Sequence, residues 1–498
     1  MSEMQPIDAS KATAHPAALA TRVRDALAWR WGTQVLAQVI TWTSTILVVR
    51  LLDPHDYGLF AMSQAVVTAL GFLNGYSFAT SLIQADRVDD RRVGQVLGML
   101  LLMNGGLALL QFAGAPAAAA YYGEPIIADM LRVQAIIFLT IPFSALPQAL
   151  LARKIDFRRQ GLVNLASAAV GASVALALAW IGWGVWALVY APVAMFATRS
   201  LGLTIAARLL VRPVFDFRGA GDLFTFGGAL TICQFLWIVQ SQSDIVIAGR
   251  AFDPHDLGLY SEALFLTLII TGRFLPPVNE VAFPTYSELY KAGQPLGPLF
   301  LRVQRMVSLV VAPAYIGLAL VAEPAVLTLF GAKWAEMAPV VAGLALAMPA
   351  FALQIVCSPA TNGMGRPGIY MATNGAGAVL FPVLFLIGIQ AGPQGLVHAW
   401  WIGAPALLLF TWALTLPQIG VPWRAVGAAL VPAVLATAAM AAAVIAARAV
   451  IPALPPFAEL VVLAGIGGAT YLAALVLFAR ETVSEIVAFL TKRQLAPA

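Results

Sequence analysis

The sequence predicts an all-α polytopic membrane protein, with about 14 transmembrane helices in two parallel-repeat six-helix bundles plus two C-terminal helices. Of its 498 residues, 60% are hydrophobic and only 11% are charged, which is more apolar material than a soluble protein can bury. The apolar residues form runs of roughly 20 residues without strict alternation. Because lipid offers backbone groups no hydrogen-bond partner, such runs predict membrane-spanning helices.

A repeated segment predicts the two bundles. The sequence RLLDPHDYGLF at residues 50–60 returns as RAFDPHDLGLY at residues 250–260. A polar DPHD turn between two apolar runs, repeated without insertion, indicates a duplicated helical bundle. Six helices return the chain to the same side of the membrane, so the repeats are parallel, and a cleft is expected between them. Two such bundles are typical of alternating-access transporters.

The apolar runs give the order of the expected elements. In the first half they lie near residues 30–52, 58–83, 94–118, 126–150, 161–181 and 185–208. In the second half they lie near 223–250, 257–281, 303–322, 337–361, 368–389 and 394–416, and two more follow near 425–447 and 457–479. The predicted domains are a cytoplasmic tail (1–27), an N-terminal six-helix bundle (28–210), a cytoplasmic linker (211–222), a C-terminal six-helix bundle (223–418), and two extra transmembrane helices with a short cytoplasmic tail (419–498).

The distribution of basic residues supports this topology. With the N-terminus inside, nearly all of the 29 Lys and Arg residues fall in cytoplasmic segments, as the positive-inside rule expects. The exceptions are Arg50, Arg250, Lys333 and Arg448 outside, and Arg132 and Arg273 within spans. The net charge of +5 therefore reflects membrane topology and not a nucleic-acid surface. Both cysteines lie in apolar runs, which indicates neither a disulfide nor a metal site.

Several ordered motifs carry a family resemblance. They are RLLDPHDYGLFAMSQ, SDIVIAGRAFDPHDLGLYSEA, AFPTYSEL at 282–289, LFGAKWAEMAPV at 329–340 and NGMGRPGIYMATN at 362–374. Together they resemble the polysaccharide-transporter (Wzx-type) flippase family of the multidrug/oligosaccharidyl-lipid/polysaccharide exporter superfamily. The resemblance implies a bacterial inner-membrane protein, not an enzyme, that moves undecaprenyl-pyrophosphate-linked oligosaccharide for exopolysaccharide, capsule or O-antigen assembly. It implies no cofactor, and as partners membrane lipids and the polysaccharide polymerase and export machinery.

Three arginines are candidate substrate ligands, because a charge within a membrane span is costly unless it faces a hydrated cavity or a partner. Arg273, just before Pro276-Pro277, is the first candidate for the pyrophosphate, since a guanidinium matches phosphate oxygens. Arg132 and Arg30 are weaker candidates. The alternative for all three is interfacial: a long side chain that reaches the headgroups, or for Arg30 an anchor between Trp29 and Trp31.

Two acids and one tryptophan complete the candidate site. Asp244 occupies the position where the first half has Ser44, so the duplication is broken in favour of a carboxylate. We interpret it as a ligand for a coupling proton or cation, or for sugar hydroxyls, against a structural pair with Arg250. Glu262, where the first half has Met62, is a second cleft acid, and Trp400 is placed to stack on a sugar ring.

The DPHD turns are interpreted as structural and not as metal or catalytic sites. Asp56 and Asp256 are expected to cap the helices that follow, and Gly58 and Gly258 to allow close helix packing.

Three other functions stay open: a multidrug or cation antiporter, a lipid II flippase, and a membrane glycan polymerase. Antiporters of this superfamily usually carry an acid in the first bundle, whereas spans one to three here contain neither Asp nor Glu. A polymerase needs a substantial outer loop for catalytic groups, and the predicted outer loops are short. Without a G-x-x-x-x-G-K-[ST] loop, the sequence gives no support for direct drive by ATP.

Overall fold

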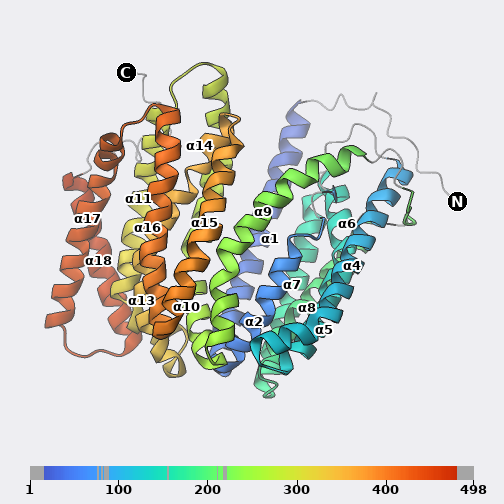
Figure 1. Cartoon of the computed structure of the whole chain (residues 1–498), viewed down its shortest axis with the longest axis horizontal. Coiled ribbons are helices and arrows are strands. Elements are labelled where there is room, and N and C mark those ends of the chain that lie inside the picture. Colours follow the sequence, from blue (N-terminus) through green and yellow to red (C-terminus); the bar gives the residue numbers. More distant parts are fainter. Residues whose placement is uncertain are drawn as a thin grey trace. The chain divides into compact units, whose positions relative to one another are not determined.

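The computed structural model describes residues 16–75, 78, 79, 82, 89–153, 156–209, 211–216 and 221–478, with side chains from residue 29 onward except 221–234. Every regular element in these ranges is a helix (Figure 1). The described residues form two compact units. One contains residues up to Leu51 and Val66–Thr231, and the other contains Leu52–Ala65 and the chain from Ile232 onward.

The first unit is built from the helices of the first repeat. They are α1 (Pro16–Leu51), the end of α2 (Pro54–Gly71), α4 (Asp90–Tyr122), α5 (Ile126–Thr140), α6 (Pro142–Arg153), α7 (Phe157–Trp180) and α8 (Trp186–Ala207). Pro142 separates α5 from α6, because proline has no N–H to continue the helical ladder. Gly123 ends α4 in the left-handed conformation (φ 79°) and donates its N–H to the Ala119 carbonyl. Helix α7 packs against both α1 and α8.

The second unit repeats this plan and adds two helices. Its helices are α9 (Gly221–Ala251), α10 (Pro254–Lys291), α11 (Gly297–Leu320), α12 (Ala322–Leu329), α13 (Ala338–Ile355), α14 (Ser358–Gly363), α15 (Pro367–Gly388), α16 (Gly392–Ile419), α17 (Trp423–Val450) and α18 (Pro456–Phe478). Two short 3-10 helices are η2 (Ala332–Met337) and η3 (Ile389–Ala391). Helix α15 packs on α16 as α7 packs on α8, and the added α17 and α18 pack on each other and on α11 and α12.

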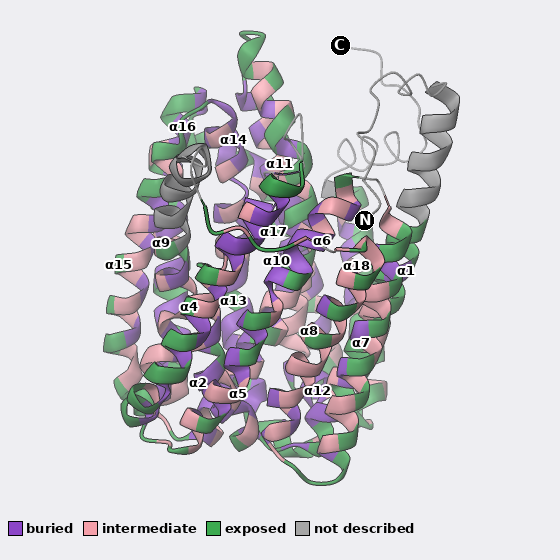
Figure 2. Ribbon diagram, turned by 90° about the vertical axis from the view of Figure 1, so that its right-hand side faces the viewer, coloured by how far each residue is buried: buried purple, intermediate pink, exposed green. Residues whose placement is uncertain are grey.

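Helix length and apolarity confirm the predicted fold class. Eleven segments among the described residues are long and apolar enough to cross a membrane, and one of them, Pro367–Ile419, contains both α15 and α16. With α2 and α9, and with the α5–α6 and α13–α14 pairs each taken as one span, the helices match the 14 predicted spans. Buried and exposed residues alternate around the helices (Figure 2), so a large apolar surface stays exposed, as lipid requires.

Two predicted boundaries differ from the structure. The second span was expected over residues 58–83, but α2 ends at Gly71, and Leu73 and Asn74 close turns onto Leu70 and Gly71. The eighth span was expected to end near residue 281, but α10 continues to Lys291 through Pro276, Pro277 and Pro284. A proline removes one hydrogen bond from the ladder, and tertiary packing of α10 against α13 and α14 holds the helix together here.

The two DPHD turns show how the repeats meet within the second unit. A Cβ built at Gly58 would overlap the Pro254 carbonyl, and a Cβ built at Gly258 would overlap the Pro54 carbonyl. The starts of α2 and α10 thus touch backbone to backbone, and each glycine leaves room for the proline carbonyl of the other turn. The expected role of Gly58 and Gly258 in close packing is confirmed.

Capping at these turns differs from the expectation. Asp253, not Asp256, is the N-cap of α10, and its Oδ1 accepts a hydrogen bond from the Asp256 N–H (2.8 Å). In the first turn the Asp56 carboxylate accepts from the Asp53 N–H (3.4 Å), while the Asp53 carboxylate pairs with Lys333 Nζ (2.7 Å). The first aspartate of each motif lies outside the helix, which is where a capping side chain reaches the free N–H groups.

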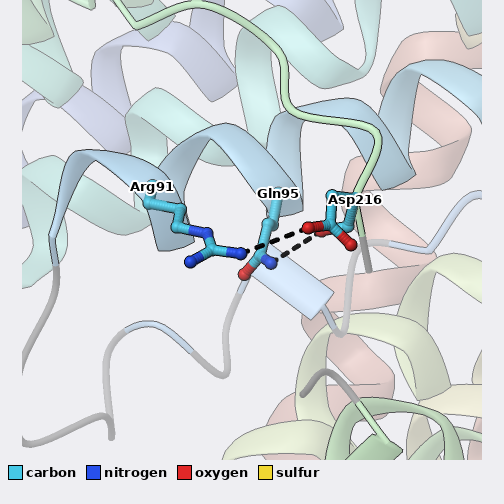
Figure 3. Close-up of polar contacts among 3 residues, drawn as sticks. All are labelled: Arg91, Gln95 and Asp216. Atoms are coloured by element: carbon cyan, nitrogen blue, oxygen red, sulfur yellow. Dashed lines mark hydrogen bonds and ion pairs between the residues drawn. The ribbon is translucent and has the colours of Figure 1, made fainter. Parts of the chain in front are cut away.

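The described part of the predicted linker lies along α4 (Figure 3). Arg91 pairs with the Asp216 carboxylate (3.2 Å), Gln95 donates to the Asp216 carbonyl (2.7 Å), and the Val214 N–H donates to the Gly94 carbonyl (2.8 Å). A Cβ at Gly94 or Gly98 would meet this segment's backbone, so both glycines make room for it. Residues 211–216 therefore belong to the first unit, and the predicted bundle boundaries at 28–210 and 223–418 stay a sequence-based division.

Candidate functional site

A buried chain of hydrogen bonds joins three helices of the second unit around Asp244. The Tyr260 hydroxyl of α10 donates to Asp244 Oδ2 of α9 (3.0 Å), and Trp400 Nε1 of α16 donates to the Tyr260 oxygen (3.0 Å). Asp244 Oδ1 also accepts from the Ile245 N–H (2.8 Å). Asp244 is 1% exposed, Tyr260 0% and Trp400 4%. Two residues predicted separately, Asp244 and Trp400, are thus linked through a third.

This network gives Asp244 no cationic partner among the described residues, so the alternative of a pair with Arg250 is not what the structure shows. A buried carboxylate costs free energy unless it is paired, hydrogen-bonded or neutralised. Here only neutral donors reach it. Because the first half has Ser44 at the matching position, whose hydroxyl donates to the Ala172 carbonyl (3.3 Å), the bundle does not need an acid there in order to pack.

Trp400 lies inside an aromatic cluster. The centroid of its ring is 4.8 Å from that of Phe381, 5.5 Å from Phe351 and 5.9 Å from Phe385. These rings cover Trp400 in this structure, so contact with a sugar would require the cluster to open. The neighbouring Trp401 is 43% exposed and donates to the Gly343 carbonyl (2.7 Å).

The remaining predicted residues lie apart from this network. Glu262 is half-buried on α10, near enough to Tyr57 for an electrostatic interaction. Arg273 is exposed on α10. Arg132 on α5 pairs with Asp129 (3.0 Å), one turn earlier on the same helix, and its guanidinium lies 5.8 Å from the Phe112 ring centroid. An i,i+3 pair of this kind is typical of a solvated helix face.

Arg30 lies in a pocket of the first unit with a volume of about 290 Å³. The pocket is bordered by α1, α6, α7 and α8. The Arg30 guanidinium lies 5.2 Å from the Phe157 ring centroid. A second arginine, Arg199 of α8, lines the same pocket. Sequence reasoning missed Arg199, because it was counted among the basic residues that mark the cytoplasmic side.

Tyr260 was also missed, and for a different reason. A tyrosine at helical spacing among Leu and Ala is typical of core packing. The signal that could have found it was its place as the last residue of the repeated motif, where the first half has Phe60. Among the described residues, no group of three His, Cys, Asp or Glu side chains is placed to hold a metal ion.

The fold and these buried charges define a class of protein: a polytopic helical membrane protein built from two related bundles. The chain belongs to the family described as "Polysaccharide biosynthesis protein", which matches residues 47–339. That range contains both DPHD turns, Asp244, Tyr260 and Arg273.

Three relatives are similar to the chain over part of its length. The succinoglycan biosynthesis transport protein ExoT of Rhizobium meliloti (strain 1021) is 27% identical over 67% of this chain and 66% of its own length. The teichuronic acid biosynthesis protein TuaB of Bacillus subtilis (strain 168) is 24% identical over 54% and 56%. The lipopolysaccharide biosynthesis protein WzxC of Escherichia coli (strain K12) is 21% identical over 59% and 60%. The chain thus matches between 56% and 66% of the length of these relatives.

Two solved structures share the fold. The lipid II flippase MurJ in an inward closed conformation superposes with a TM-score of 0.73 at 12% identity, over 91% of this chain and 99% of MurJ. An inward-facing multidrug resistance MATE family transporter of the MOP superfamily gives 0.59 at 14% identity, over 78% and 94%. Identities this low show a common fold, and they leave the transported molecule open.

Proposed function

We propose that the chain is a flippase that moves an undecaprenyl-pyrophosphate-linked oligosaccharide across the bacterial inner membrane by alternating access, for exopolysaccharide, capsule or O-antigen assembly. The observation that carries the proposal is the family match over residues 47–339 on a helical bundle with a transporter fold. The names of ExoT, TuaB and WzxC support it, since they refer to the biosynthesis of succinoglycan, teichuronic acid and lipopolysaccharide.

The proposal assigns each candidate residue a task. The substrate carries two phosphates that must leave water, a polar glycan, and a prenyl tail that stays in lipid. Arg30, Arg132 and Arg273 would meet the phosphates, because a guanidinium offers paired donors to phosphate oxygens. Asp244 and Glu262 would take the coupling proton or cation, and Trp400 would contact the glycan after its aromatic cluster opens. The proposal also includes a substrate cleft between the two bundles, and an N-terminus and a C-terminus that both lie in the cytoplasm.

Asp244 is the residue on which the coupling task depends most. Its carboxylate is tied to α10 and α16 through Tyr260, so a change in its charge would act on three helices at once. Binding of a proton or cation removes the cost of the buried negative charge, and this differential free energy is what a coupling ion must supply to shift a conformational equilibrium.

The test is deletion of the gene followed by complementation. Cells without the chain should lose surface polymer and accumulate lipid-linked oligosaccharide on the inner leaflet, and the unsubstituted chain should restore both. Asp244→Asn should fail to restore polymer at equal membrane abundance. Ser241→Ala is the matched control, because its hydroxyl bonds only to its own helix, at the Ile238 carbonyl (3.4 Å).

The same experiment separates the alternatives. Surface polymer that is unchanged by the deletion contradicts the proposal. Accumulation of the peptidoglycan precursor would indicate a lipid II flippase, and drug sensitivity alone would indicate an antiporter. If the deletion strain accumulated no substrate on the inner leaflet but held unpolymerised glycan outside the membrane, the chain would be a polymerase and therefore an enzyme.

A further inference from the structure

The pocket around Arg30 and Arg199 is a concentration of positive charge inside one unit. It lies between the end of α6 and the start of α7, on the side predicted to face the cytoplasm. Its polar lining consists of Arg30, Thr33, Gln34, Gln148, Gln160, Asn164 and Arg199, and none of the described residues that line it is acidic. At about 290 Å³, it has room for a small anion with its hydration.

Arg199 is held in place but is not fully satisfied. Its Nη2 donates to Gln148 Oε1 (2.8 Å), whereas its Nε is buried without a hydrogen-bond partner among the described residues. Gln160 Nε2 donates to the Gln148 carbonyl (2.8 Å), which fixes the end of α6 against α7. The Asn164 Oδ1 is likewise buried and unpartnered, and a half-turn of that carboxamide would present its NH2 to a ligand. Buried polar atoms without a hydrogen-bond partner are costly.

Neither pocket arginine pairs with a carboxylate among the described residues, unlike other arginines of the same unit. Arg159 pairs with Asp156 (3.3 Å) and Arg91 with Asp216 (3.2 Å). A charge inside a membrane bundle without a counter-ion in the protein points to a counter-ion from outside it. The lining therefore selects an anion and rejects a cation.

The second half of the chain shows that packing does not require this charge. Helix α16 takes the place of α8 in the repeat, and none of its 28 residues is Asp, Glu, Lys or Arg. Arg199 is in turn the single charged residue of the 22 in α8. The duplication has thus kept the helix and confined the charge to the first half.

We propose that this pocket is a diphosphate-binding site for the lipid-linked substrate, with Arg30 and Arg199 as its charged ligands and Gln148, Gln160 and Asn164 as their supports. The inference rests on the proposed function. Two guanidinium groups without an acid match a diphosphate diester, which carries one negative charge on each phosphate. The phosphodiester of an ordinary phospholipid would neutralise only one of them. Exposed Arg30 would admit the anion, and Arg199 would hold it deeper.

The test measures binding of labelled inorganic pyrophosphate to the full chain in phosphatidylcholine nanodiscs, which contain no anionic lipid. We expect Arg199→Gln and Arg30→Gln each to weaken binding by about tenfold, and orthophosphate to bind more weakly than pyrophosphate. Arg159→Gln is the matched control, because this arginine lies at the same end of α7 but outside the pocket, paired with Asp156. It should bind pyrophosphate as the unsubstituted chain does.

Two results would overturn the assignment. One is unchanged pyrophosphate affinity in both Arg30→Gln and Arg199→Gln. The other is loss of pyrophosphate binding when the nanodiscs contain about 30 mol% phosphatidylglycerol, since the occupant would then be a bulk lipid headgroup. Arg30 is exposed, so its variant keeps the test valid if Arg199→Gln fails to fold. The two proposals can fail separately. If the unsubstituted chain restores surface polymer but neither substitution changes the pyrophosphate affinity, the pocket assignment is wrong and the flippase proposal stands.

Discussion

The two copies of the repeat share the same helix packing but differ in their buried charged residues. Where the DPHD turns meet, the copies are interchangeable, since Gly58 rests on Pro254 as Gly258 rests on Pro54. Away from the turns they diverge in opposite directions. The first half carries Arg199 where α16 has no charge, and the second half carries Asp244 where the first has Ser44. The two copies therefore share the glycines and prolines that position α2 and α10, whereas each buried charge is present in one copy and has no counterpart in the other.

The largest expected effect comes from breaking the shared contact. Gly58→Ala should lower the free energy of unfolding by about 3 kcal/mol, because the new Cβ would overlap the backbone of Pro254, which cannot rotate away as a side chain can. Thermal unfolding in detergent measures this loss. Gly427→Ala in α17 is the control, since its Cβ would meet nothing within 4 Å and should not destabilise the protein. Equal melting temperatures for the two variants would contradict the backbone contact.

A smaller loss is expected from the network found only in the second copy. Tyr260→Phe leaves both Asp244 Oδ2 and Trp400 Nε1 without their partner, at a cost of about 1–3 kcal/mol. Thermal unfolding again reports it. Asp244→Asn keeps an acceptor for the Tyr260 hydroxyl, so it should be more stable than Tyr260→Phe and yet fail in complementation. If Asp244→Asn were less stable than Tyr260→Phe, the negative charge of Asp244 itself would stabilise the packing of the three helices.

The part of the predicted linker that lies along α4, residues 211–216, allows a test within the first unit. Gly94→Ala places a Cβ 2.7 Å from the Arg212 carbonyl and 2.8 Å from a Val214 methyl, so residues 211–216 should be displaced at a cost of about 1 kcal/mol. Chymotrypsin should then cleave after Phe215 several times faster. Gly106→Ala, in the same helix with open space around it, should leave the cleavage rate unchanged. Indifference of the rate to Gly94→Ala would mean that the segment is not held there.

The smallest expected effect is at the exposed ion pair between Lys333 and Asp53, which distinguishes the two turns. Lys333→Gln removes the partner of Asp53, which is itself about 61% exposed, and should cost less than about 1 kcal/mol. The difference should shrink further at high ionic strength, because salt screens exposed charges. A melting-temperature loss as large as that of Tyr260→Phe would show that Asp53 does more than pair at the surface.

Sequence patterns predicted the helices well because membrane spans are constrained by length and apolarity alone. The helices from Pro54 and Pro254 were the exceptions. The first ends at Gly71 although the predicted run continues to residue 83, and the second continues to Lys291 although its predicted run ends near residue 281. The site was only partly predictable. Asp244 was found because it breaks the repeat, whereas Tyr260 and Gln148 look like ordinary residues of apolar runs. Their roles depend on which helix lies opposite, and a single sequence does not contain that information.

The glycine contact between α2 and α10 has a mechanical consequence. Helices usually settle into preferred crossing angles because ridges of side chains seat in the grooves of the neighbour. At Gly58 and Gly258 there are no side chains to interlock, and two smooth backbones meet. The contact itself therefore does not fix the crossing angle between α2 and α10. One helix can rotate against the other at this point without displacing interlocked side chains.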